Sequence, residues 1–458
     1  MIGVATTRRY QATGIQGAGF GIMLLAQFFL YSRVFDLALT YLHLTVIAYG
    51  IALLAAIFAG GVQRAFNQRI GLLMLGWHVW LVLCVPFSVW RGGSVVVLES
   101  AAFGLGVYVI TAGLIVNYAQ YRRTVLVLAL SILTLAVLTV PFHAITAGRV
   151  CPEQGRFANP NDFAQVMLMV LPLWWWLARS ATGSPVRRVF ALMCITFLLI
   201  MMATTGSRGS MISLVITALV MFLSARGRSR VVLAAGALAF GLAAALLLPD
   251  ALRERYVSFL RDNEPEIVEM SIESAREEMA ATESVEKRRS LLIDSVITTF
   301  QHPIFGVGPG VFAVSMGAQA AEAGERYFAQ TTHNTYTQVS SEAGIPALLL
   351  YLGILVYSFK ATRVQIPASL RQDPRAAEIS QAGFALRLCL IAFAVSAMFS
   401  SFGYAVFLPT LAGLAVAFQR TAAAELAYRV SLQPPPASPV VTEQNRLRTF
   451  ASRGRAAR

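Results

Sequence analysis

The chain has 458 residues, of which 57% are hydrophobic and 13% are charged, and its mean hydropathy is +0.64. A soluble domain carries about a quarter charged residues, so this composition excludes an ordinary soluble globular protein. The formal net charge of +14 would suit a nucleic-acid-binding protein if the chain were soluble.

Long apolar runs predict an all-α, polytopic bundle of about twelve transmembrane helices, because a bilayer span needs about 20 apolar residues. The predicted spans lie at approximately 14–32, 38–59, 69–90, 95–117, 124–147, 162–179, 188–205, 209–225, 231–249, 343–360, 382–401 and 403–419. No small-residue cleavage site follows the first span, so we expect it to be retained.

This pattern divides the chain into four parts. They are a set of about nine spans in residues 1–249, a large polar loop at 250–342, the last spans at 343–419, and a basic, proline-rich tail at 420–458.

Basic residues concentrate in the short loops of one side, which the positive-inside rule assigns to the cytoplasm. The opposite short loops carry few arginines, namely Arg33, Arg91, Arg149, Arg156 and Arg208. Residues 250–345 hold 15 acidic and 8 basic residues and are net negative. We therefore predict a bacterial inner-membrane protein with both termini cytoplasmic and the large loop periplasmic. The positive charge is then a topology signal that also attracts anionic lipids, and no nucleic-acid partner is expected.

Two short outward loops carry polar motifs. In the segment from Gly155 to Asp162, Arg156, Asn159 and Asn161 could line a polar pocket, although Asn161 or Asp162 could instead cap the next helix. In Gly206-Ser207-Arg208-Gly209, the guanidinium lies among glycines and hydroxyl groups, which suits a phosphate or pyrophosphate. The simpler interpretation of Arg208 is a side chain that reaches outer lipid headgroups.

The large loop predicts two helical stretches, one from 264 to 286 and one whose apolar stripe is Leu292, Val296 and Phe300. The basic pair Arg288-Arg289 lies between them. After a glycine-rich stretch, the loop ends with His333-Asn334-Thr335-Tyr336, and Glu342 begins the next span. Ionisable groups at a membrane boundary are costly and are candidates for function, and a histidine suits proton transfer.

The four cysteines, Cys84, Cys151, Cys194 and Cys389, are scattered along the chain and indicate neither a disulfide framework nor a metal site.

These motifs, taken in order, resemble the O-antigen ligase/polymerase superfamily. The resemblance is carried by Phe157-Ala158-Asn159-Pro160-Asn161, by Gly206-Ser207-Arg208-Gly209, by Arg288 with the run from His302 to Phe312, by His333-Asn334-Thr335-Tyr336 and by Glu342-Ala343-Gly344.

The resemblance implies a GT-C-like membrane glycosyltransferase that uses no metal and no cofactor. It implies inverting transfer of a glycan from undecaprenyl pyrophosphate to an acceptor hydroxyl, on an acceptor glycan or on lipid A core. His333, Arg208 and Arg288 take the catalytic roles, although Arg288 and its neighbour Arg289 are not separable by motif. Arg156, Asn159, Asn161, Arg289, Asn334, Tyr336 and Glu342 are the candidate substrate-binding residues.

Two alternatives remain open from sequence. A ligase and a polymerase share these motifs. A transporter of a small solute or a lipid-linked sugar is the alternative of a different class, since twelve spans are common there; it would place polar groups near the bilayer midplane. The clustering of polar motifs on the outer side favours the enzyme.

Overall fold

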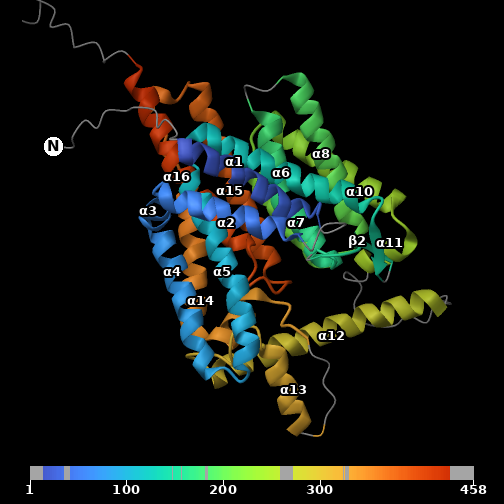
Figure 1. Ribbon diagram of the computed structural model, residues 1–458. Helices are drawn as coiled ribbons and strands as arrows, with labels where there is room; N and C mark the ends of the chain where they lie inside the picture. Colours follow the sequence, from blue (N-terminus) through green and yellow to red (C-terminus); the bar gives the residue numbers. More distant parts are fainter. Residues whose placement is uncertain are drawn as a thin grey trace, which may run out of the picture.

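The computed structural model describes residues 14–35, 42–146, 148–155, 157–180, 184–257, 272–322, 324 and 330–433, and these form a helical bundle with a two-stranded hairpin (Figure 1). Side chains are described from residue 286 onward in the long helix α12.

The α-helices are α1 (Gly14–Ser32), α2 (Leu44–Phe58), α3 (Gly61–Phe66), α4 (Arg69–Cys84), α5 (Arg91–Leu114), α6 (Tyr118–Thr139), α7 (Pro160–Arg179), α8 (Pro185–Thr204), α9 (Arg208–Ser224), α10 (Arg228–Leu247), α11 (Asp250–Val257), α12 (Ile272–Gln301), α13 (Phe312–Glu322), α14 (Thr335–Ala361), α15 (Pro374–Ser396) and α16 (Phe407–Ser431). Short 3₁₀ turns lie at η2 (Val85–Phe87) and η3 (Ala368–Leu370). The hairpin is made of β1 (His143–Thr146) and β2 (Arg149–Pro152).

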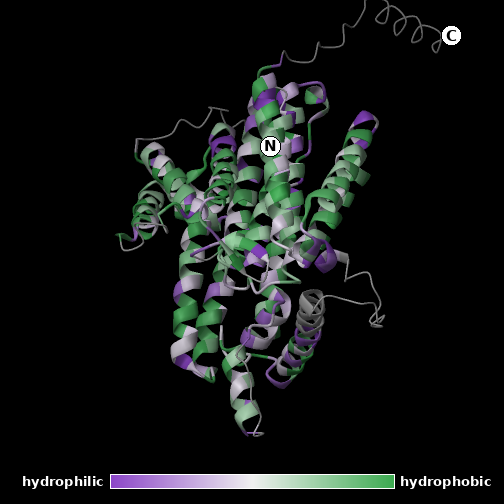
Figure 2. Ribbon diagram, turned by 90° about the vertical axis from the view of Figure 1, so that its right-hand side faces the viewer, coloured by the Kyte–Doolittle hydropathy of each residue, from purple (hydrophilic) through white to green (hydrophobic). Residues whose placement is uncertain are grey.

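Eight of the described helices are long and apolar enough to cross a membrane, namely α1, α4 with η2, α5, α6, α8, α10, α14 and α15. Helices α2 and α9 are also apolar but shorter. Figure 2 shows hydrophobic residues along the long helices and hydrophilic residues gathered toward their ends. The predicted class, an all-helical membrane protein, agrees with this arrangement. Each of the twelve predicted ranges overlaps a helix, whereas twelve complete spans stay a prediction.

The predicted span 124–147 is wrong at its outer end. Helix α6 begins at Tyr118 and stops at Thr139, just before Pro141, whose ring cannot continue a helix. The apolar run continues instead as β1, and Ala144 of β1 pairs with Cys151 of β2.

Residues 420–431, at the start of the predicted basic tail, belong to α16, which continues to Ser431. The Arg420 guanidinium donates to the backbone carbonyls of Ala112 and Ile115, each at 2.6 Å, at the end of α5. A cation is favourable at the C-terminal end of a helix. Arg420 therefore joins α16 to α5.

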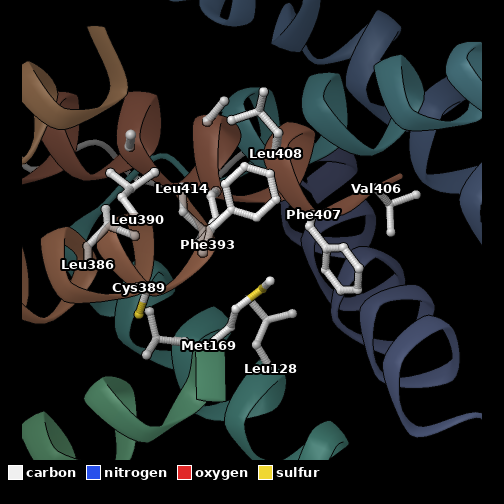
Figure 3. Packing of buried hydrophobic residues seen from close by; sticks show 14 of the residues in the cluster. Leu128, Met169, Leu386, Cys389, Leu390, Phe393, Val406, Phe407, Leu408 and Leu414 are labelled. Carbon is white, nitrogen blue, oxygen red and sulfur yellow. The ribbon is translucent and has the colours of Figure 1, made fainter. Parts of the chain in front are cut away.

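The buried core lies where α6, α7, α15 and α16 pack together. Figure 3 shows Leu128 of α6, Met169 of α7 and Phe393 of α15 among its members. Trp174 and Trp176 of α7 are almost completely buried. This core fixes the two ends of the bundle relative to each other.

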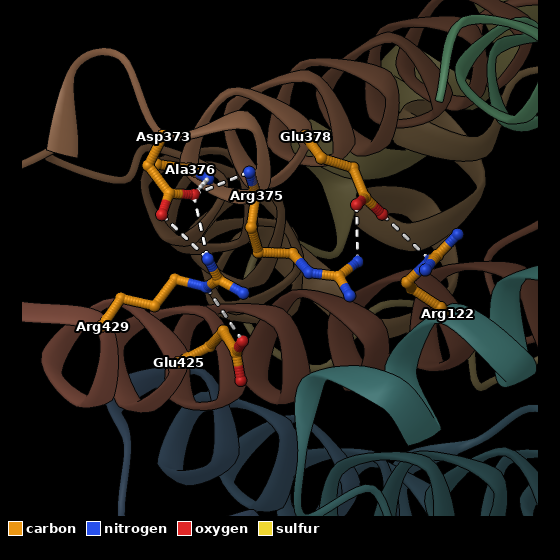
Figure 4. Close-up of polar contacts among 7 residues, drawn as sticks. All are labelled: Arg122, Asp373, Arg375, Ala376, Glu378, Glu425 and Arg429. Carbon is orange, nitrogen blue, oxygen red and sulfur yellow. Dashed lines mark hydrogen bonds and ion pairs between the residues drawn. The ribbon is translucent and has the colours of Figure 1, made fainter. Parts of the chain in front are cut away.

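One end of the bundle carries ion pairs that join α6, α15 and α16 (Figure 4). Glu378 accepts Arg122 Nε at 2.9 Å and Arg375 Nη1 at 2.6 Å. Arg429 pairs with Asp373 at 2.8 Å and with Glu425 at 3.2 Å. We name this group the paired cluster; its members are Arg122, Asp373, Arg375, Glu378, Glu425 and Arg429.

Candidate functional site

The turn between α8 and α9 is the centre of the candidate site, at the end of the bundle away from the paired cluster. Gly206 has φ of +60°, a left-handed conformation that favours glycine. A Cβ atom there would lie 3.0 Å from Leu252, 3.2 Å from the Arg255 Cδ atom and 3.3 Å from the Arg149 Cγ atom. The glycine therefore leaves room beside the turn for the aliphatic parts of the Arg149 and Arg255 side chains. Arg208 follows the turn as the first residue of α9.

Arg149 reaches this turn from β2. Its Nε donates to the Thr205 carbonyl at 2.7 Å, and its Nη2 donates to the Asn161 side-chain oxygen at 2.6 Å. The β1–β2 hairpin takes the place of the last turns of the predicted span. It thus positions the Arg149 guanidinium at the site. Asn161, predicted from sequence as a site residue, is the group that orients it.

Helix α11 supplies a second arginine. Arg255 Nε donates to the Gly206 carbonyl at 3.0 Å, and the Tyr256 hydroxyl donates to the Ala203 carbonyl at 2.9 Å. Burial raises the pKa of Tyr256 to about 12, so its phenol stays protonated near neutral pH.

Arg288 and Arg289 are adjacent in sequence but point to different sides of helix α12. Arg288 is partly buried, and its charge lowers the pKa of Arg149, Arg208 and His333. Arg289 is exposed and lies on another face, because successive helical residues are rotated by about 100°. The structure therefore brings Arg288, and not Arg289, to the other arginines.

His333 lies in the segment that leads into α14. Its backbone is left-handed, with φ of +50°, and its N–H donates to the Ser401 hydroxyl at 3.0 Å. Among the described residues, none forms a hydrogen bond with its imidazole ring. Burial, followed by the charge of Arg288, lowers the pKa of His333. The ring is therefore mainly neutral near pH 7 and able to accept a proton.

Arg149, Arg208, Arg255 and Arg288, which we name the site arginines, act on one another electrostatically. Burial and the charge of Arg255 lower the pKa of Arg149, to about 10, and lower the pKa values of Arg208 and Arg288. Within the described ranges, no carboxylate pairs with Arg149 or Arg288. Partly buried cations that repel one another favour an anion placed between them.

Two asparagines that were predicted to bind substrate act as helix caps. The Asn159 side chain accepts from Asn161 N at 2.8 Å at the start of α7. The Asn334 side chain accepts from Tyr336 N at 2.9 Å and from Thr337 N at 3.2 Å at the start of α14. These bonds occupy both side-chain oxygens, and they fix the start of each helix beside Arg149 or His333.

Tyr336 and Glu342 lie further along α14, and their polar groups are engaged within the protein. The Tyr336 hydroxyl donates to the Ala394 carbonyl at 2.7 Å. Glu342 is buried and accepts from Gly310 N at 3.0 Å and from Phe312 N at 3.4 Å.

The glycine-rich stretch from His302 to Gly310 is packed against α14. Pro303 accepts a backbone bond from Ile345 at 2.8 Å, and Val307 donates to Ser341 at 2.9 Å. Gly344 has φ of +82°, and a Cβ there would collide with the Ile304 carbonyl. The motif therefore folds the end of α12 onto α14, which sets the position of Arg288 relative to His333.

Arg156, a predicted phosphate contact, lies outside the described residues. Arg149 and Arg255 are the site residues that sequence reasoning missed. Arg149 had one signal, its position on the side where arginines are rare, but Arg255 lies in an acidic segment without a motif. Within the described part of the chain, no three His, Cys, Asp or Glu side chains are grouped so as to hold a metal ion.

The chain was compared with known protein families. Residues 192–352 match the family model described as O-antigen ligase, from α8 through most of α14. This range contains Arg208, Arg255, Arg288 and His333, while Arg149 lies before it. No curated protein sequence shows significant similarity to the chain.

Proposed function

Because residues 192–352 match the family model described as O-antigen ligase, we propose that this chain transfers a glycan from undecaprenyl pyrophosphate to an acceptor hydroxyl at the periplasmic face of the inner membrane. The observation that carries the proposal is the set of site arginines around one turn, beside a histidine whose pKa is lowered. A pyrophosphate group matches that charge, since guanidinium groups bind phosphate oxygens in pairs.

In the proposed reaction, the acceptor oxygen bonds to the anomeric carbon while the bond from that carbon to the pyrophosphate oxygen breaks. The electron pair of the broken bond leaves with undecaprenyl pyrophosphate, where the site arginines stabilise the developing negative charge. The hydroxyl proton passes to the His333 imidazole. A single displacement of this kind inverts the anomeric configuration, and its charge stabilisation comes from arginine side chains without a metal ion.

The roles of the four arginines differ in this proposal. Arg149 and Arg255 are held by the carbonyls of Thr205 and Gly206, so they provide fixed positive charge. Arg288 has no hydrogen-bond or ion-pair partner among the described residues, so its guanidinium is available to the pyrophosphate. Arg208, at the first turn of α9, adds its charge to a helix N-terminus that also favours anions.

The proposed orientation of the chain in the membrane uses the two ends of the bundle that carry the paired cluster and the site arginines. We place the paired cluster in the cytoplasm, where the basic loops are predicted, and the site arginines in the periplasm. A reporter that is active in the periplasm alone, fused near Ala318 in α13, is expected to be active. An inactive fusion at Ala318, combined with an active fusion after Ser431, would reverse the orientation.

The direct test uses the purified protein in lipid nanodiscs with an undecaprenyl-pyrophosphate-linked glycan and an acceptor. We expect the wild-type protein to release undecaprenyl pyrophosphate and extend the acceptor, and Arg208→Ala and His333→Ala to lose transfer while remaining folded. Arg253→Ala is the matched control, because Arg253 is an exposed arginine that pairs with Asp250 on α11. Equal transfer by all variants would remove the proposed mechanism.

Ligase and polymerase differ in the product that accumulates when the protein is missing. In a strain that lacks this chain, long glycans left on the lipid carrier indicate a ligase, and single repeats indicate a polymerase. Loss of surface polysaccharide in strains that carry His333→Ala or Arg208→Ala, with normal protein in the membrane, is expected in both cases.

A further inference from the structure

Helix α12 has an inverted distribution of side chains between its two faces. Its buried face carries Ser295, Thr298 and Thr299, together with Leu291, and these are at most 7% exposed. The Thr299 hydroxyl lies 2.8 Å from the Ser340 hydroxyl of α14. Three of these four buried residues therefore carry hydroxyl groups. A helix at the surface of a soluble protein buries its apolar face instead.

The opposite face of α12 is apolar and exposed. It consists of Leu292, Ile293, Val296, Ile297 and Phe300, which are 39–73% exposed and follow the spacing of one helical face. In water, five such neighbours would form an unusual apolar patch. The sequence stripe Leu292, Val296 and Phe300 is thus confirmed as helical, but it points away from the bundle.

The apolar face continues into other exposed apolar groups at the end of a candidate span. Ile304 follows α12 and is exposed, and its neighbour Phe305 stacks on Phe87 with ring centroids 4.0 Å apart. Phe87 belongs to the connection between α4 and α5, where Trp90 is also exposed. Tryptophan is typical of the boundary between hydrocarbon and water.

The other end of the exposed face of α12 carries an arginine. Arg289 lies three and four residues before Leu292 and Ile293, so it extends the same exposed row. Arg288 belongs to the buried row with Leu291 and Ser295. Figure 1 shows that α12 runs crosswise to the candidate spans α4, α5 and α14.

From these observations, we propose that the exposed face of α12 rests in the outer leaflet of the bilayer, with Arg289 bound to lipid phosphate groups. Leu292, Ile293, Val296, Ile297 and Phe300 enter the acyl boundary, as in other amphipathic interfacial helices. The long arginine side chain reaches back to the headgroups. Because Arg288 lies on the opposite face, the same contact holds its guanidinium toward the site.

The test places a nitroxide label on α12 in the full-length protein, reconstituted in nanodiscs of phosphatidylethanolamine and phosphatidylglycerol. The four native cysteines are buried, so a cysteine introduced on the surface can be labelled selectively. Ile297→Cys carries the label on the apolar face of α12, and Glu322→Cys carries it on an exposed polar position at the end of α13, away from that face. Collision rates with oxygen, which concentrates in lipid, are compared with those of a water-soluble nickel chelate.

We expect oxygen to exceed the nickel chelate several-fold at position 297 and the order to reverse at position 322. Equal access of the nickel chelate to both positions would overturn the proposal. A label at 297 that neither reagent reaches would also overturn it, because another protein surface would then cover the face. Val296→Cys repeats the measurement if the first variant does not fold. No outcome depends on glycan transfer, so the test is independent of the proposed activity.

Discussion

The two ends of the bundle use arginine in opposite ways. In the paired cluster, Arg122, Arg375 and Arg429 each meet a carboxylate within 3.2 Å (Figure 4). Around the turn at Gly206, Arg149 and Arg255 meet backbone carbonyls, and burial together with the neighbouring charges lowers the pKa of Arg149.

The difference separates a structural group from the proposed binding group. The paired cluster is neutralised by the protein itself and joins three helices. The site arginines retain their mutual repulsion, which the packing around them must offset, and an anionic ligand would relieve it. Arginines that repel one another and are nevertheless held close together therefore indicate a ligand site better than a count of arginines does.

The largest expected effect comes from Arg288→Ala. The rate of glycan transfer should fall by about 10²- to 10³-fold, equivalent to about 3–4 kcal/mol, as for the loss of one group that stabilises a developing charge. Thermal unfolding should be unchanged or shifted upward, because the variant removes a repelled cation. Arg253→Ala, measured in the same assay, should retain the wild-type rate; equal losses in both variants would contradict a specific role for Arg288.

Removing a carboxylate from the paired cluster should have the contrary result. Glu378→Gln leaves Arg122 and Arg375 without their buried anion, and breaking a buried ion pair in this way costs about 3 kcal/mol. We expect a lower thermal unfolding temperature in detergent, with the rate per folded molecule preserved. A variant that unfolds normally but transfers no glycan would place the paired cluster in the catalytic machinery.

Inorganic pyrophosphate should distinguish the two clusters by binding. At ten times its dissociation constant, a ligand specific for the folded state stabilises by about 1.4 kcal/mol. We expect wild-type protein and Arg429→Ala to gain this stabilisation in a thermal unfolding experiment, and Arg288→Ala to lose most of it. Sulfate at equal ionic strength is the control, and an equal gain from sulfate would indicate a general salt effect.

The smallest expected effect is on pH dependence. A base is active when deprotonated, so transfer should decline as pH falls through the pKa of His333, which lies below its usual value of about 6.5. Arg288→Gln removes a positive charge that lowers this pKa, so the acid limb of the rate profile should move to higher pH. Arg289→Gln is the matched comparison, and a shift of the same size in that variant would contradict the proposed pairing of Arg288 with His333.

Much of the helical framework could be predicted from sequence, because span length and apolarity are local properties. The end of α6 was mispredicted, since hydropathy does not distinguish an apolar strand after Pro141 from one more helical turn. Hydropathy does not indicate that α16 continues into the predicted tail, because Arg420 is polar and its partners, the carbonyls at the end of α5, lie about 300 positions earlier.

The site could be predicted in part. Arg208, Arg288 and His333 belong to short ordered motifs, and the structure brings their charges together. Arg149 and Arg255 depend on contacts with residues 56 and 49 positions away, which no local pattern indicates. Asn159, Asn334 and Glu342 were recognised as notable polar residues, but sequence alone did not reveal that their side chains bind backbone N–H groups.

The carbonyls of Thr205 and Gly206 are consecutive, and each accepts the Nε atom of a different arginine. The spacing between these two guanidinium groups is therefore inherited from the geometry of a single peptide unit. We expect evolutionary change in glycan preference to spare this turn and to accumulate in the residues around it. Laboratory evolution toward a new sugar is best directed at α12, which packs against α11, with residues 205–208 left unchanged.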